Sequence, residues 1–104
     1  MFSRITLFEI DVLRISVDAA LKQFKELIAP EMRKQGGYEG AYVMTTPDGK
    51  GLVMTLWASK EAAVASEESG YYDAQIAKFV SLFRAPAGRD HYEVILADPP
   101  KAGV

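Results

Sequence analysis

The chain has 104 residues and a mass of 11.4 kDa, a size that allows one domain and excludes a two-domain enzyme. Hydrophobic residues make up 49% and charged residues 25%, which is ordinary globular usage and argues against a disordered chain. The net charge of −2 supplies no basic field for phosphates, so nucleic acid is not an expected partner.

The chain contains no cysteine, which excludes disulfide bridges, thiolate metal ligands and a cysteine nucleophile. No apolar run approaches the roughly 18 residues of a membrane span, and no signal-peptide pattern opens the chain. We therefore expect a soluble cytoplasmic protein that does not interact with membranes. One domain is expected over residues 1–97, and the proline-containing residues 98–104 are expected to form a flexible tail.

The first predicted element is a strand over residues 2–11, with apolar side chains on both faces. Ser16 is a suitable N-cap for the helix that follows, whose apolar residues recur at helical spacing as far as Met32. Pro30 lies inside this pattern and is expected to kink or end the helix. Gly36 and Gly37 then close the segment.

The second half of the chain repeats strands and helices without a long linker. Ser59 is a second N-cap, and Ala85-Pro86-Ala87-Gly88 separates the last helix from the last strand. We expect strands at 38–46, 51–58 and 90–97, a turn at 47–50, an alanine-rich helix at 60–68 and a longer helix at 72–83.

This β-α-β-β-α-β order predicts an α+β protein with the ferredoxin-like arrangement, a four-stranded antiparallel sheet with helices on one face. Apolar side chains occupy both sides of the strands, and a wet second face would expose a large apolar patch. Pairing of two sheets face to face in a homodimer explains the pattern, and irregular strand edges are the alternative. The third strand carries Leu52, Met54 and Leu56 on one side and Val53, Thr55 and Trp57 on the other.

Three segments carry a resemblance to a known family. Residues 51–62 contain a strand that ends in Trp57 and a capped helix rich in alanine and glutamate. With the junction at 36–40 and the closing strand at 92–94, this pattern resembles the antibiotic biosynthesis monooxygenase family of dimeric α/β barrels, over residues 2–96. The resemblance implies sheets that pack across a two-fold axis. Some members of the family oxidise polycyclic phenols with O₂ and no cofactor, others degrade haem, and many have no assigned activity.

The resemblance also implies functional residues that this chain lacks. Haem-degrading members use an asparagine on the first strand, a tryptophan in the later helix and a histidine beyond it. Counted from Trp57, these last two places fall at Ser66 and Ile76, and the chain contains no asparagine. Haem degradation is therefore disfavoured. The quinone-forming members also use an asparagine, so this absence weakens the monooxygenase interpretation too.

Two residues are candidates for catalysis. His91 is the only histidine and the natural proton acceptor near neutral pH. Its alternative role is that of a half-exposed residue at a strand end, bonded to the backbone. Tyr72 could donate a hydrogen bond to a substrate oxygen, or it could be a core tyrosine whose hydroxyl reaches the surface.

Five further residues are candidates to line a substrate pocket. Arg4 could bind a phenolate, or it could pair with Glu9 or Glu93 across the sheet. The others could stack on or enclose an aromatic ligand, and they could equally be ordinary core residues. The candidate pocket residues are Trp57, Phe24, Phe79, Met54 and Arg4.

No metal or cofactor is expected, since one histidine and scattered carboxylates give no ligand spacing and no glycine-rich loop precedes a helix. The run Ser66-Glu67-Glu68-Ser69 is interpreted as a solvated helix end. The functional hypothesis is a cofactor-independent monooxygenase for an aromatic or polyketide-like molecule. The alternative is a non-catalytic binding or assembly module of the same fold. A small-molecule function requires a cavity of about 300 Å³.

Overall fold

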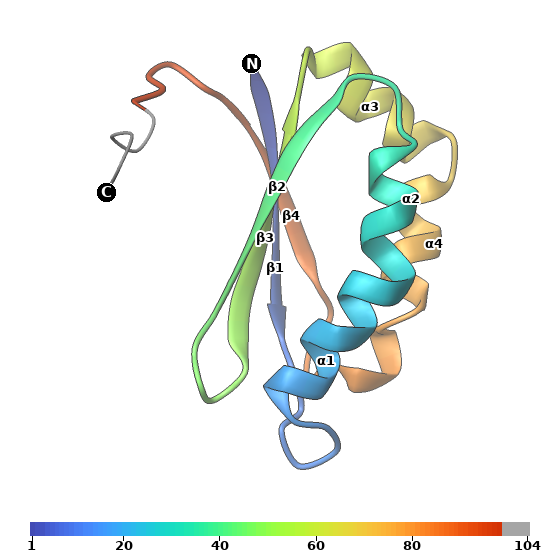
Figure 1. Ribbon diagram of the computed structural model, residues 1–104, viewed down its shortest axis with the longest axis vertical. Helices are drawn as coiled ribbons and strands as arrows, with labels where there is room; N and C mark the ends of the chain where they lie inside the picture. Colours follow the sequence, from blue (N-terminus) through green and yellow to red (C-terminus); the bar gives the residue numbers. More distant parts are fainter. Residues whose placement is uncertain (99–104) are drawn as a thin grey trace.

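A computed structural model describes residues 1–98 of the chain. Of the predicted tail at 98–104, only Asp98 lies within the described residues. Four antiparallel strands form one sheet in the order β2-β3-β1-β4, and all helices cover one of its faces (Figure 1). The strands are β1 (Phe2–Glu9), β2 (Tyr38–Thr45), β3 (Lys50–Trp57) and β4 (Gly88–Glu93). The predicted ferredoxin-like α+β fold is confirmed.

Two helices begin where the sequence places their serine caps. The hydroxyl of Ser16 accepts a hydrogen bond from the backbone N–H of Ala19, and the hydroxyl of Ser59 accepts one from Ala62, both at 3.1 Å. Each bond satisfies one of the N–H groups that a helix start leaves unpaired. The α-helices are α1 (Val17–Gln23), α2 (Ala29–Arg33), α3 (Lys60–Glu68) and α4 (Tyr71–Ala77).

Pro30 interrupts the α-helical hydrogen bonding without ending the helical segment. A π-helical turn, Phe24–Ile28, joins α1 to α2, so the three pieces run as one rod in Figure 1. Within this turn the N–H of Ala29 bonds to the carbonyl of Phe24, five residues back. Because a proline ring collides with the carbonyl four residues before it, the wider turn accommodates Pro30.

The longer helix predicted over residues 72–83 is shorter in the structure. Helix α4 ends at Ala77, a 3₁₀ turn occupies Val80–Leu82, and Phe83 is extended. The carbonyl of Leu82 accepts the N–H of Asp11 at 2.8 Å, and Phe83 forms a bridge with Ile10. Residues 82 and 83 therefore bond to the end of β1 and do not continue the helix. Local periodicity cannot predict this long-range pairing.

The last strand was predicted over residues 90–97, but β4 begins and ends earlier. Its pairing partner is β1, with Gly88 opposite Leu7 and Glu93 opposite Phe2. Beyond this ladder, the N–H of Val94 still donates to the carbonyl of Met1 at 3.1 Å. Beyond the strand, Ile95 is 92% exposed.

The two faces of the sheet differ in what covers them. Side chains of Arg4, Thr6 and Trp57 point towards the helices and are buried, whereas Leu7 on the other face is 56% exposed. The uncovered face nevertheless carries large apolar side chains, as the strand pattern predicted. Its half-exposed members are Leu7, Tyr42, Met44 and Tyr92.

The core lies between the sheet and the helices. Ile28, Met32 and Phe79 form its buried cluster, and Phe24 and Phe83 pack against them. None of the helices among residues 1–98 is long and apolar enough to cross a membrane.

Candidate functional site

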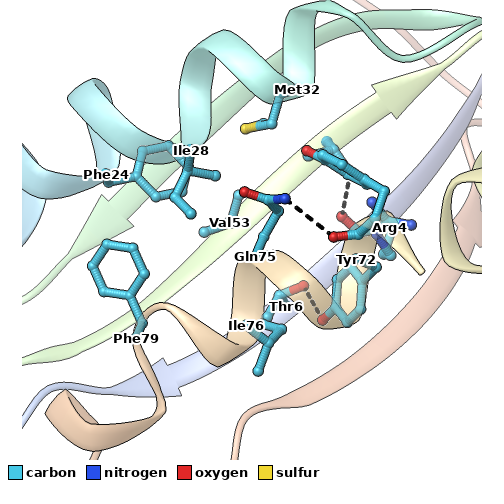
Figure 2. A pocket seen from close by; sticks show the side chains of 12 residues that line it. Arg4, Thr6, Phe24, Ile28, Met32, Val53, Tyr72, Gln75, Ile76 and Phe79 are labelled. Atoms are coloured by element: carbon cyan, nitrogen blue, oxygen red, sulfur yellow. Dashed lines mark hydrogen bonds between the residues drawn. The ribbon is translucent and has the colours of Figure 1, made fainter.

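A cavity lies between the helices and β1 and β3, with a volume of about 70 Å³. Figure 2 shows that its two ends differ in chemistry. Hydroxyl, amide and guanidinium groups gather around Arg4 and Tyr72, and the rings of Phe24 and Phe79 lie at the opposite end. The polar lining is Arg4, Thr6, Thr55, Tyr71, Tyr72 and Gln75, and the apolar lining is Phe24, Ile28, Met32, Val53, Ile76 and Phe79.

The polar end is held by a hydrogen bond between a strand and a helix. The hydroxyl oxygens of Tyr72 on α4 and Thr6 on β1 lie 2.7 Å apart, and either can be the donor. On the neighbouring strand, Thr55 accepts a hydrogen bond from the indole N–H of Trp57 at 2.9 Å. These bonds satisfy buried polar groups that the fold would otherwise leave unpaired.

Arg4 is the only charged side chain among the described lining residues, and it is 2% exposed. Its Nη1 nitrogen donates to Ser66 Oγ at 2.9 Å and to Glu67 Oε2 at 3.1 Å. The guanidinium carbon also lies 4.4 Å from the ring centre of Tyr72 and 5.0 Å from that of Trp57. Both ring faces attract a cation, so Arg4 is fixed by charge and by stacking.

Glu67 is the counter-charge of Arg4 and also binds two residues of β4. Its Oε2 lies 2.6 Å from His91 Nε2, and its Oε1 lies 3.3 Å from Arg89 Nε. Burial raises the pKa of Glu67, but hydrogen bonds from His91 and Arg4 outweigh it, and the pKa lies below its usual value. The carboxylate is therefore ionised at neutral pH, and His91 donates to it from Nε2.

This geometry corrects two expectations. The partner of Arg4 is Glu67 on α3, neither Glu9 nor Glu93 on the sheet. The predicted solvated helix end holds only in part, because Ser66 is buried and the side chain of Glu67 is 11% exposed, whereas Glu68 is exposed. Four residues of one charged run thus face different environments, because successive residues of a helix point in different directions.

The structure brings together four of the seven predicted site residues. Arg4 and Tyr72 lie at the polar end of the cavity, and Phe24 and Phe79 lie at its apolar end. The rings of Phe24 and Phe79 are 6.5 Å apart. Side chains from β1, α4 and the π-helical turn therefore meet at one site.

The other three predicted residues do not line this cavity. Met54 lies between Val53 and Thr55, which do line it, and alternation along a strand puts Met54 on the uncovered face of the sheet. Trp57 is 1% exposed and lies under the guanidinium of Arg4 as a packing residue. His91 is partly exposed, and its ring stacks on Phe2. The ring nitrogen Nε2 bonds to the carboxylate of Glu67 and not to the backbone.

Sequence reasoning missed Thr6, Ser66 and Glu67. No local pattern marks them, since a threonine on a strand and a serine and a glutamate on a helix are common surface residues. The position of Arg4 within a predicted strand offers an indirect signal, because a charged side chain that becomes buried in a sheet requires an opposite charge.

Two further properties limit the chemistry of the site. Burial raises the pKa of Tyr71 to about 12, so this hydroxyl stays protonated at neutral pH. Within residues 1–98, no group of three or more His, Asp or Glu side chains could hold a metal ion.

A second, wholly apolar cavity of about 50 Å³ adjoins the first and shares Phe24, Val53 and Phe79 with it. Each volume is far below the roughly 300 Å³ that a small-molecule function was expected to require, so neither of these two cavities meets that expectation. An aromatic ligand therefore requires the lining side chains to move apart.

Comparison with known proteins found similarity in structure alone. No family model and no curated protein sequence matches the chain. Among solved structures, a variant of SnoaB, a cofactor-independent oxygenase from Streptomyces nogalater, matches with a TM-score of 0.73 and 11% identity. This match covers 95% of this chain and 97% of that one.

Two other matches have different activities. The ActVA-Orf6 monooxygenase of Streptomyces coelicolor, solved with nanaomycin D, has a TM-score of 0.71 and 19% identity, and the match covers 96% of this chain and 92% of that one. The haem degrader MhuD of Mycobacterium tuberculosis has a TM-score of 0.69 and 19% identity, over 95% and 100% of the two chains. The fold thus serves more than one reaction. Over nearly its whole length, this chain has the fold of the antibiotic biosynthesis monooxygenases.

Proposed function

We propose that this protein is a monooxygenase that needs no bound cofactor and uses O₂ to oxidise an acidic aromatic substrate, a phenol or an enol. The observation that carries the proposal is the two-ended cavity, with Arg4 and the hydroxyl pair of Thr6 and Tyr72 opposite an aromatic wall. A cofactor-independent oxygenase and a monooxygenase solved with nanaomycin D share the fold, which supports the same class of reaction.

The first chemical task is to form and hold the substrate anion. A guanidinium in a buried site favours the ionised form of a phenol and lowers its pKa. No His, Asp or Glu is among the described residues that line the cavity, so the proton leaves to water and the charge of Arg4 supplies the driving force. Either Tyr72 or Thr6 can donate its one hydroxyl proton to a substrate oxygen while it accepts the proton of the other hydroxyl.

The second task is the reaction with O₂. The electron-rich anion gives electrons to O₂, and a ring CH₂ of an anthrone becomes a carbonyl. One oxygen atom enters the product, and the other leaves as water with the two hydrogens of the CH₂ group. The protein contributes orientation of the anion and exclusion of water from the reacting carbon.

We also infer that the working form is a homodimer in which two uncovered sheet faces pack together. Leu7, Tyr42, Met44 and Tyr92 form an apolar patch on this face, and burial of such side chains contributes about 1.5–3 kcal/mol each. A second copy of the same patch is the simplest complementary surface.

Oxygen uptake across a panel of hydroquinones and anthrones tests the monooxygenase proposal. We expect uptake with at least one anthrone, about tenfold or more lower in Arg4→Gln and unchanged in the matched control Arg33→Gln, which alters an exposed residue of α2. Loss of substrate without oxygen uptake, or equal rates in both variants, contradicts the proposal.

A non-catalytic binding module is the second candidate function, favoured by the lack of a carboxylate or histidine among the described lining residues. Tight binding of an aromatic ligand with no oxygen uptake supports it. Haem degradation remains disfavoured, because Ile76 occupies the cavity wall at the place counted for the histidine. Titration with haem should therefore give no Soret shift and no loss of absorbance with a reductant.

A further inference from the structure

Glu67 occupies the centre of a cluster of charges behind the cavity. The carboxylate on α3 binds Arg4 of β1 at 3.1 Å, Arg89 of β4 at 3.3 Å and His91 of β4 at 2.6 Å. One helix residue thus joins β1, which lines the polar end of the cavity, to the neighbouring strand β4. Glu67 itself does not line the cavity, so any effect it has on a ligand acts through Arg4.

The hydrogen bonds of Arg4 are distributed unevenly over its guanidinium group. All three of its side-chain bonds, to Ala63, Ser66 and Glu67, come from Nη1. No bond from Nε or Nη2 is found within the part of the chain that the structure describes, although the side chain is almost fully buried. Neither nitrogen is fully enclosed by protein atoms, since among residues 1–98 the fully buried side-chain atom without a partner is Ser3 Oγ. Arg4 lines the cavity, so a ligand there can accept from these two nitrogens.

The charges around Arg4 do not cancel. One carboxylate faces two guanidinium groups, since Arg4 and Arg89 both bind Glu67, and these three side chains together keep one net positive charge. The Tyr72 ring lies 4.4 Å from one guanidinium carbon and 4.9 Å from the other. This excess charge is shared with Arg89, whose side chain is 41% exposed, and at Arg4 it favours one anionic group on a ligand.

We infer that Glu67 is a positioning residue, which anchors Nη1 of Arg4 so that Nε and Nη2 bind a single anionic group of the ligand in the cavity. The inference rests on the proposed function only in taking the cavity as the ligand site. Beyond the proposed function, the inference names the residue that orients the guanidinium of Arg4. It also states that the cavity prefers a ligand with one negative charge.

Two probes of one size and shape, benzoate and benzamide, test the inference because they differ in charge. Affinities are measured by NMR titration of the wild type, Glu67→Gln and the control Glu68→Gln, which changes the exposed neighbour. We expect the wild type and Glu68→Gln to bind benzoate at least about tenfold more tightly than benzamide. Glu67→Gln should lose this preference while its affinity for benzamide is unchanged.

The sign of the change separates positioning from simple charge balance. Removal of a negative charge makes the cluster more positive, so a higher benzoate affinity in Glu67→Gln would overturn the inference. An equal loss for both probes would show a merely structural role, and a wild type without benzoate preference would also contradict it. If Glu67→Gln does not fold, Glu67→Asp keeps the charge one methylene further from Arg4, and an unchanged benzoate preference in this variant would overturn the inference. None of these outcomes depends on oxygen uptake, which tests the proposed reaction separately.

Discussion

The hydroxyl oxygens of Tyr72 and Thr6 lie 2.7 Å apart in the buried space between α4 and β1. Tyr72 also lies beside the guanidinium groups of Arg4 and Arg89. This one contact therefore joins the helical layer to the central strand and shapes the polar end of the cavity. It links the stability of the fold to the chemistry of the site.

Tyr72→Phe should lower the free energy of unfolding by about 1–3 kcal/mol, because it leaves the buried hydroxyl of Thr6 without its partner. Urea denaturation measures this change. Adding Thr6→Val to Tyr72→Phe completes a double-mutant cycle, in which we expect a coupling of about 1 kcal/mol. Additive effects of the two substitutions would show that the hydrogen bond contributes nothing.

The stabilisation that ionised Glu67 contributes to the folded protein should be lost in acid. Because its pKa is lowered in the folded state, its contribution is fully present above its pKa in the unfolded chain, about 4.3, and is lost as the pH falls through the folded-state value. Urea denaturation between pH 7 and pH 3 should therefore show a steeper decline for the wild type than for Glu67→Gln. Parallel pH profiles of the two proteins would contradict this assignment.

Leu7→Lys should convert a dimer into a folded monomer. Leu7 is 56% exposed on the uncovered face of the central strand, so a lysine there reaches water in the monomer and disrupts a packed sheet interface. Light scattering at micromolar concentration should give about twice 11.4 kDa for the wild type and one copy for the variant. The matched control is Leu13→Lys, since Leu13 is 95% exposed outside the sheet. A wild type that stays monomeric and folded would refute the dimer.

Gly37→Ala should destabilise the protein, whereas Gly36→Ala should not. Gly37 has φ +78°, and a Cβ atom there would lie 2.5 Å from the Cβ of Ala62 on α3, so the variant combines backbone strain with a steric clash. We expect a loss of about 1–3 kcal/mol. No atom lies within 4 Å of a Cβ atom at Gly36, and we expect a change below about 1 kcal/mol. Thermal unfolding of both variants measures the difference, and equal shifts would contradict the structure at this junction.

Site residues that follow the periodicity of one helix were predictable from the sequence. Site features that depend on contacts between distant segments were not. Phe24 and Phe79 follow helical spacing, and both reach the cavity. Met54 was a candidate for the pocket and does not line this cavity, because alternation along a strand shows that two sides exist without showing which side the helices cover. Arg4 was identified as an ion-pair residue, but its partner lies 63 residues away on α3.

Local sequence patterns specify the order of strands and helices, the two serine caps and the apolar character of both sheet faces. These features depend on residues a few positions apart, where capping and periodicity act. The tertiary structure alone decided the bounds of β4, the end of α4 and the burial of Glu67. Each depends on which residue of a distant segment lies opposite, because pairing register and the rotation of a helix over a sheet are fixed by the packing of the whole domain.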